Sequence, residues 1–208
     1  GTESIECAVK MARKYYFDKG EIGKNKVITF EGSFHGRSMT AISASGAEKL
    51  TKGFAPLLPG FESLRLEDFA SLRSFDFEEV CGVLVEPIQG EGGILPVSKE
   101  FLQELRDICD KRNVLLIFDE IQSGIGRSGD FFSYQHAGVN PDIVAVAKGI
   151  GGGFPLGCCL ATQKAASGMT VGSHGSTFGG NPLACAVGQA VLNEIFSNGF
   201  LQAVKAQG

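Results

Sequence analysis

The chain has 208 residues, 43% of them hydrophobic, and a formal net charge of -4. That length suits one large domain or two small ones with a sizeable core, and the acidic balance argues against a nucleic-acid-binding protein. No segment resembles a signal peptide, and no apolar run approaches the ~20 residues of a membrane span. The six cysteines lack C-x-x-C spacing and the three histidines lack paired metal-ligand spacing, so we expect free thiols in the cytoplasm and no metal site.

Stretches with helical periodicity alternate with short apolar runs along the chain. Ser98 and Asn181 stand where helix N-caps are favoured, and a proline follows the asparagine as it does at many helix starts. The expected elements, in chain order, are a helix over Thr2–Lys19, a strand over Lys26–Phe30, a loop over Glu31–Gly60 with a short helix near Ser38–Ala44, a strand over Gly82–Glu86, a helix from Ser98 through Arg112, strands over Val114–Asp119, Ile143–Ala147 and Leu156–Ala161, and a helix from Asn181 to Asn198–Gly199.

This alternation predicts an α/β domain with a mainly parallel central sheet and helices on both faces. Strands covered on both faces are apolar throughout, as "VLLIFD" is. In such sheets ligands bind at the carboxyl ends of the strands. Glu86, Asp119 and Lys148 stand at those ends, so we expect the chemistry to gather along that edge.

A dinucleotide site is one alternative, because Gly124, Gly126 and Gly129 form the pattern G-x-G-x-x-G. That fingerprint should join a strand directly to a helix. Here "EIQS" separates it from the strand, no helical start follows, and no acidic residue ends a next strand about 20 positions on. The pattern therefore does not favour a nucleotide site. The glycines of "KGIGGG" are no Walker loop either, because the lysine precedes them.

Asp119 and Lys148 leave two interpretations open. They could pair with each other across the sheet, since a buried carboxylate needs a cationic partner. They could instead serve pyridoxal phosphate, whose aldehyde condenses with a lysine and whose pyridinium nitrogen needs a carboxylate. The start of the first helix, "GTE", could supply backbone N–H groups for the phosphate.

Several motifs resemble one family when taken together and in order. They are "GTES", "FHGR", "VEPIQGEGG", "FDEIQSGIGRSG", "AKGIGGGFPLG" and "HGSTFGGNPLA". The chain resembles the class III pyridoxal-phosphate aminotransferases of the ornithine and acetylornithine type from residue 1 to about residue 197. The resemblance implies a fold-type I large domain that binds pyridoxal 5'-phosphate.

The resemblance also implies roles for individual residues. Lys148 would bind the cofactor aldehyde covalently and later act as the general base, and Asp119 would hold the pyridine nitrogen. The remaining implied cofactor contacts are Gln122 near the ring hydroxyl, Ile121 and Phe34 on the two ring faces, Glu120 and Glu86 as supporting groups, and Gly1 and Thr2 at the phosphate.

On the substrate side, Arg37 would bind the α-carboxylate with its bidentate fork, and Ser176 would contact the donor. Glu91 would pair with an arginine outside this sequence and release it for glutamate. Thr177 would complete the phosphate site of a partner subunit, which makes the expected assembly a homodimer. No role is assigned to His35.

The implied reaction moves the terminal amino group of N2-acetylornithine to 2-oxoglutarate, a step of arginine biosynthesis. Ornithine δ-aminotransferase, or another ω-amino acid aminotransferase of the class, is the alternative enzyme. The chain opens without methionine, and the family's chains are about twice as long. We therefore expect residues 1–208 to be a fragment that lacks an N-terminal segment and a C-terminal small domain. An inactive, dimerising core is the non-enzymatic alternative.

Overall fold

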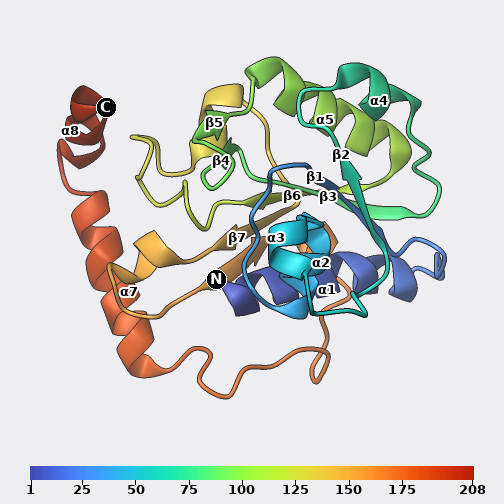
Figure 1. Cartoon of the computed structure of the whole chain (residues 1–208). Helices are drawn as coiled ribbons and strands as arrows, with labels where there is room; N and C mark the ends of the chain where they lie inside the picture. The colour runs from blue at the N-terminus through green and yellow to red at the C-terminus, as the bar shows by residue number, and fades with distance from the viewer.

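A six-stranded sheet in the order β2-β1-β3-β6-β7-β8 forms the centre of the computed structural model, which describes residues 1–208 (Figure 1). Its strands are β1 (Lys26–Phe30), β2 (Phe61–Leu64), β3 (Val80–Val85), β6 (Leu115–Asp119), β7 (Ile143–Val146) and β8 (Cys158–Ala161).

Neighbouring strands of this sheet are parallel except for β8, which pairs antiparallel with β7. The fold class predicted from the sequence is therefore confirmed. Asp119 at the end of β6 lies in register with Ala145 of β7. Because β7 ends at the next residue, the segments that leave β6 and β7 start at the same edge of the sheet.

Helices cover both faces of the sheet. One face carries α1 (Thr2–Asp18), whose apolar stripe of Ile5, Ala8 and Ala12 packs on residues of β3, β6 and β7. Alongside lie the short helices α2 (Met39–Ser45), α3 (Glu48–Thr51) and α6 (Gln163–Ala166). The opposite face carries α4 (Phe69–Ser74) and α5 (Lys99–Arg112), with Phe101, Leu102 and Leu105 buried against β3 and β6.

The C-terminal helices α7 (Pro182–Ile195) and α8 (Phe200–Gln207) lie beside the sheet rather than on one of its faces (Figure 1). A small third cluster, which includes Ile125, Val146 and Ile195, joins α7 to the loops that follow β6 and β7. The N-cap side chain of Asn181 accepts a bond from Ala184 N, as predicted. The helix ends at Ile195, before the predicted Asn198–Gly199.

Several short helices and strands were not predicted from the sequence. They are β2, α3, α4, α6, α8, the two-residue strands β4 (Ile88–Gln89) and β5 (Leu95–Pro96), and the 3-10 helices η1 (Ser133–Ala137) and η2 (Lys148–Gly151). Each is too short for a periodic pattern to stand out, except α8. No helix combines the length and the apolar character that crossing a membrane would require, and all six cysteines are free thiols.

Candidate active site

Two cavities open at the carboxyl edge of the sheet and meet at Lys148, which lines both. The larger has a volume of about 1040 Å³ and lies between the start of α1, η2 and the helices α7 and α8. The smaller has a volume of about 490 Å³ and lies between the β4–β5 turn and the loop after β6. Gly149 and Arg127 are also shared by the two walls.

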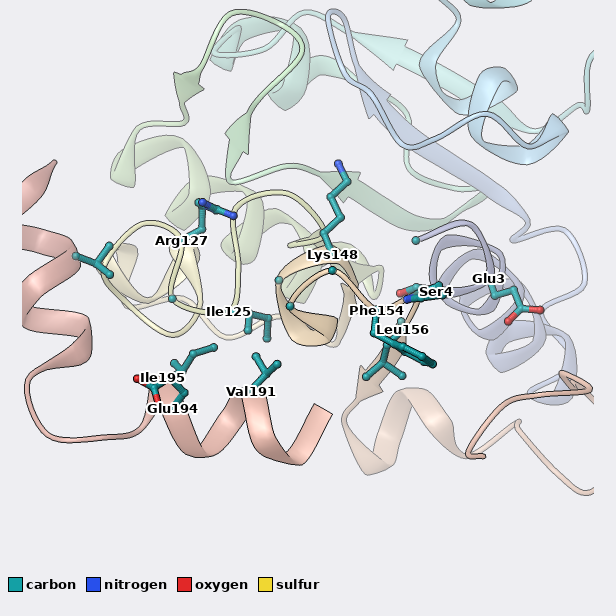
Figure 2. A pocket seen from close by; sticks show the side chains of 18 of the residues that line it. Glu3, Ser4, Ile125, Arg127, Lys148, Phe154, Leu156, Val191, Glu194 and Ile195 are labelled. Atoms are coloured by element: carbon teal, nitrogen blue, oxygen red, sulfur yellow. The ribbon is translucent and has the colours of Figure 1, made fainter. Parts of the chain in front are cut away.

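Lys148 begins η2, separated from the end of β7 by one residue, with a positive φ of 47°. A non-glycine residue in this left-handed region is uncommon, and such conformations concentrate at functional sites. Its neighbours in β7 are buried, but the lysine itself is exposed. In Figure 2 its side chain extends away from the apolar cluster of Ile125, Val191 and Ile195.

The Asp119 carboxylate is buried at the end of β6 and is held at both oxygens. Oδ2 lies 2.8 Å from His35 Nδ1, and Oδ1 accepts a bond of 3.0 Å from Ile121 N. No hydrogen bond or ion pair joins it to Lys148, so the simple pairing of the two across the sheet does not occur. Gly1 lies within electrostatic range of both the Asp119 carboxylate and the Lys148 amine.

His35 is a site residue to which the sequence assigned no role. Burial alone would lower the pKa of this imidazole, but the hydrogen bond and the charge of Asp119 outweigh burial and raise it. Its Nε2 is buried without a hydrogen-bond partner. When protonated, His35 is the cationic partner that a buried carboxylate requires.

Glu86 follows β3, between the strands that lead to His35 and Asp119. Its Oε2 accepts a bond of 2.9 Å from Phe34 N. Burial raises the pKa of Glu86 to about 7, with the nearby charge of His35 lowering it and that of Asp119 raising it. The ends of β1, β3 and β6 thus share one buried cluster of two carboxylates and an imidazole.

Gln122 reaches across the smaller cavity to the β4–β5 turn. A Cβ built on Gly90 would lie 1.3 Å from Gln122 Oε1, so only glycine at position 90 leaves this amide in place. Ile121, the residue before it, is buried against Gly1, where an added Cβ would meet its side chain at 3.2 Å.

The first turn of α1 is open to the larger cavity. Gly1 is its N-cap and no side chain caps the helix, while Gly1, Thr2, Glu3 and Ser4 all line the cavity. A helix of this length has free N–H groups and a partial positive charge at its start, which suits an anion. The phosphate contacts expected of Gly1 and Thr2 stay a prediction, for which this open helix start is the structural basis.

Phe34 and Arg37 lie in the loop after β1, with Phe34 half-buried and Arg37 exposed. The Arg37 guanidinium lies over the Phe34 ring, 5.9 Å from its centre. The contact is in the range of a cation–π interaction, and it places the two predicted ligand contacts side by side.

Glu120, expected as a supporting group, contacts the loop after β6 and the start of η1. Its oxygens accept bonds from Ser123 Oγ, Ser133 Oγ and Tyr134 N at 2.7 to 3.0 Å. Burial raises the pKa of this carboxyl group, and these bonds oppose the rise. The glutamate fastens the segment after β6 to η1, which makes it a positioning residue.

The last three predicted residues lie on exposed turns. Ser176 donates to both Glu3 oxygens, at 3.2 and 3.0 Å, and Thr177 follows it in an exposed loop. Glu91 lies at the tip of the β4–β5 turn. Within this chain, none of the three lines the cavities that meet at Lys148.

Sequence reasoning also missed Arg127, which lines both cavities and is exposed. Figure 2 shows its side chain on the same side of the cavity as Lys148. Arg127 stands in the motif "GIGRSG", which the sequence analysis considered only as a possible nucleotide-binding pattern. In the structure that glycine pattern forms turns between β6 and η1 and opens no α-helix.

These residues fit pyridoxal phosphate. The fit rests on an exposed lysine that follows β7, on a buried carboxylate at the end of the neighbouring strand β6, and on an uncapped helix start that lines the same cavity as the lysine. An aldehyde, a ring nitrogen and a phosphate group would each find its chemical partner there.

The whole chain, residues 1–208, matches the sequence model of aminotransferase class-III. Acetylornithine aminotransferase of Agrobacterium fabrum is 56% identical over 205 residues, which are 99% of this chain and 51% of that protein. Succinylornithine transaminase of Yersinia pseudotuberculosis is 50% identical over 213 residues, covering 100% of this chain and 51% of that protein.

Solved structures share the fold. Ornithine aminotransferase from Toxoplasma gondii, crystallised with partial occupancy of PLP at its active site, matches with a TM-score of 0.88 at 38% identity. The match covers 93% of this chain and 47% of that one. The chain thus spans about half the length of the relatives that it matches. The motifs had predicted both the fold and the family, and the chain belongs to the class-III aminotransferases.

Proposed function

We propose that this chain is the cofactor-binding large domain of a pyridoxal-phosphate-dependent aminotransferase that moves the terminal amino group of N2-acetylornithine to 2-oxoglutarate. One observation carries the proposal. An exposed amine at the end of β7 and a buried, histidine-held carboxylate at the end of β6 lie beside an uncapped helix start.

When bound, pyridoxal phosphate supplies an electron sink for the carbon that bears the transferred amino group. The Lys148 amine would hold the cofactor aldehyde and, once released, carry the proton between donor and cofactor carbons. Asp119 would keep the ring nitrogen protonated. Because His35 and Ile121 N already bind its oxygens, that carboxylate is oriented before the cofactor arrives.

The other cofactor contacts follow from position. Gln122 would approach the ring hydroxyl, and Phe34 and Ile121 would enclose the ring. Gly1 and Thr2 would bind the phosphate through the open turn of α1. Glu120 and Glu86 would position the loops that carry these groups, which is supported by their contacts with backbone and serine donors.

We assign substrate recognition to exposed groups. Arg37 would bind the α-carboxylate of the donor, and Ser176 would contact its side chain. Glu91 would pair with an arginine outside residues 1–208 and release it when glutamate binds. Thr177 of each subunit would complete the phosphate site of the other in a homodimer. The exposure of the loop that carries it, with Phe178 79% exposed, supports a partner there. The free thiols support a cytoplasmic location.

The choice of donor rests on the relatives. The acetylornithine enzyme is 56% identical, the succinylornithine enzyme 50% and the ornithine enzyme 38%. Steady-state rates with the three donors and 2-oxoglutarate test the choice. We expect kcat/KM for acetylornithine to exceed that for free ornithine by at least an order of magnitude, because a pocket built for an acyl amide rejects a charged amine. A preference for ornithine would assign the alternative activity.

A dimerising core without activity is the second candidate. Its observation is that the chain covers only about half of each relative. Titration of the 208-residue chain with pyridoxal phosphate separates the candidates. A chain that dimerises but carries no cofactor after gel filtration has removed the unbound excess would support the second.

A further inference from the structure

The loop that carries Arg37 is held on both sides of a glycine. On the first side, His35 is buried and its Nδ1 lies 2.8 Å from Asp119 Oδ2. Gly36 then has a φ of 121°, in a range that glycine enters without steric cost. The contacts of His35 therefore do not fix the direction in which the chain leaves Gly36. The placement of Arg37 depends on what holds the second side.

Glu6 of α1 holds that second side. Its Oε1 accepts a hydrogen bond of 2.8 Å from Ser38 Oγ, and its Oε2 accepts one of 2.8 Å from Thr40 Oγ1. Both carboxylate oxygens thus bind hydroxyl groups at the start of α2, and Ser38 is the residue directly after Arg37. Hydrogen bonds to a carboxylate are stronger than those between neutral groups, so α1 fixes the chain at this point.

The bond from Ser38 also orients the N-cap of α2. Ser38 Oγ accepts a bond of 3.3 Å from Ala41 N. A serine hydroxyl carries one proton and two lone pairs. Because Glu6 takes the proton, a lone pair is left to face the Ala41 N–H. Without the carboxylate the hydroxyl is free to turn, and the cap of the helix that starts just after Arg37 weakens.

The Arg37 side chain has no comparable anchor of its own. It is exposed, and its guanidinium lies over the Phe34 ring at 5.9 Å from the ring centre. A long, flexible side chain keeps many rotamers at such a site. The position of the Arg37 backbone therefore decides where the guanidinium can reach, and Glu6 acts on that backbone through the adjacent Ser38.

The same helix carries the proposed phosphate contact. Thr2 and Glu6 are four residues apart in α1, so they lie on one face of the helix. The apolar stripe of α1 is buried against the sheet, which keeps the helix in place. One rigid element thus holds the open first turn and, one turn later, the start of the segment that follows Arg37.

We propose that Glu6 is a positioning residue for donor recognition, which sets the place of the Arg37 guanidinium relative to the first turn of α1 through Ser38 and Thr40. This inference rests on the proposed function, which assigns the α-carboxylate of the donor to Arg37. Glu6 lines neither cavity, so it acts through Arg37 rather than on the ligand. Its effect is confined to donors that carry an α-carboxylate.

Two donors that differ only in the carboxylate test the proposal. N2-acetylornithine carries the group, and N-acetyl-1,4-diaminobutane is the same molecule without it. The first half-reaction of the holoenzyme is followed by the absorbance of the cofactor, without 2-oxoglutarate. In Glu6→Ala we expect the half-saturating concentration of acetylornithine to rise about tenfold, with less than about a twofold change in the maximal rate. The carboxylate-free donor should react as it does with the unaltered protein.

Further variants show whether Glu6 acts through Arg37. Arg37→Ala should weaken acetylornithine binding at least as much as Glu6→Ala, and the double variant should lose little more, because both changes remove one interaction. Glu6→Gln keeps one acceptor oxygen and should recover part of the affinity. Glu48→Ala, at an exposed glutamate of α3, is the matched control and should leave both donors unaffected.

Amide hydrogen exchange gives a readout that needs no turnover. In the cofactor-free protein, the Ala41 N–H should exchange about tenfold faster in Glu6→Ala than in Glu48→Ala, since its acceptor is the Ser38 hydroxyl that Glu6 orients. Equal exchange in the two variants would contradict the hold of Glu6 on the start of α2.

The outcomes separate this inference from the proposed function. If Arg37→Ala weakens acetylornithine binding while Glu6→Ala does not, the inference is wrong and the proposed function stands. Equal weakening of both donors in Glu6→Ala would mean a general distortion of the site and would also overturn the inference. If Arg37→Ala itself leaves acetylornithine binding unchanged, the proposed role of Arg37 fails, and the inference fails with it.

Discussion

His35 Nδ1 and Asp119 Oδ2 lie 2.8 Å apart, with 0% and 4% of their side chains exposed. They reach each other from β1 and β6, across the end of the strand that separates them. That strand, β3, is followed by Glu86, a second buried carboxylate. The three groups form one buried titratable cluster at the carboxyl edge of the sheet, and their protonation affects the free energy of unfolding.

Two replacements of His35 distinguish its hydrogen bond to Asp119 from the space that its side chain fills. His35→Leu would leave the Asp119 carboxylate buried without its cation, at a cost of about 3 to 5 kcal/mol in the free energy of unfolding. His35→Asn keeps a donor near the Nδ1 position and should recover part of that loss. Urea unfolding at pH 6 measures both, and cofactor titration should show the same order of affinities. Equal behaviour of the two variants would show that the hydrogen bond does not orient Asp119.

Glu86 predicts how stability changes with pH. Its pKa is raised from 4.5 to about 7 by burial, so the folded protein binds this proton more tightly than the unfolded chain. Its contribution to stability is complete below pH 4.5 and is lost as the pH rises to about 7, a change of about 3 kcal/mol. Glu86→Gln should remove that fall. Urea unfolding between pH 4.5 and 8 measures it, and parallel curves for the two proteins would contradict the shift.

Gly90 tests the placement of Gln122. An alanine methyl group would occupy the position of Gln122 Oε1, and the flexible amide would move away. Gly90→Ala and Gln122→Ala should therefore weaken cofactor binding alike, and the double variant should add little to either. Gly23→Ala, where an added Cβ meets nothing within 4 Å, is the control. Additive effects in the double variant would contradict the shared cause.

Ser133 tests the role of Glu120. Ser133→Ala removes a bond of 2.7 Å to that buried carboxylate and one of 3.0 Å to Ser123. We expect a loss of about 1 to 3 kcal/mol in the free energy of unfolding. Ser74→Ala, at an exposed serine, should change stability by less than ~0.5 kcal/mol. A loss no larger than that of the control would mean that Glu120 does not fasten this loop.

The alternation of apolar runs and amphipathic helices was enough to predict the sheet and its main helices. The first helix was expected over Thr2–Lys19 and is observed over Thr2–Asp18. Short elements such as α3 and β4 were missed, because four residues or fewer carry no period. The antiparallel direction of β8 was also missed, since strand direction depends on a connection that composition does not encode.

The residues of the candidate site that could be predicted from the sequence are those at the ends of strands. Asp119 ends one apolar strand and Lys148 follows another, so their place at the carboxyl edge of the sheet could be predicted from the sequence. The partner of Asp119 could not, because His35 comes from a loop and joins it only when β1, β3 and β6 assemble. Glu120 stands beside Asp119 in the sequence, yet its contacts lie with η1, which local sequence could not indicate.

Reductive trapping tests the role of Lys148 most directly. The protein is mixed with pyridoxal phosphate, reduced with borohydride, digested and mapped by mass spectrometry. At stoichiometric amounts we expect the cofactor on Lys148 and on no other lysine, with the label at this position absent in Lys148→Ala. Label spread over surface lysines such as Lys14 and Lys164, with Lys148 unmodified, would contradict it.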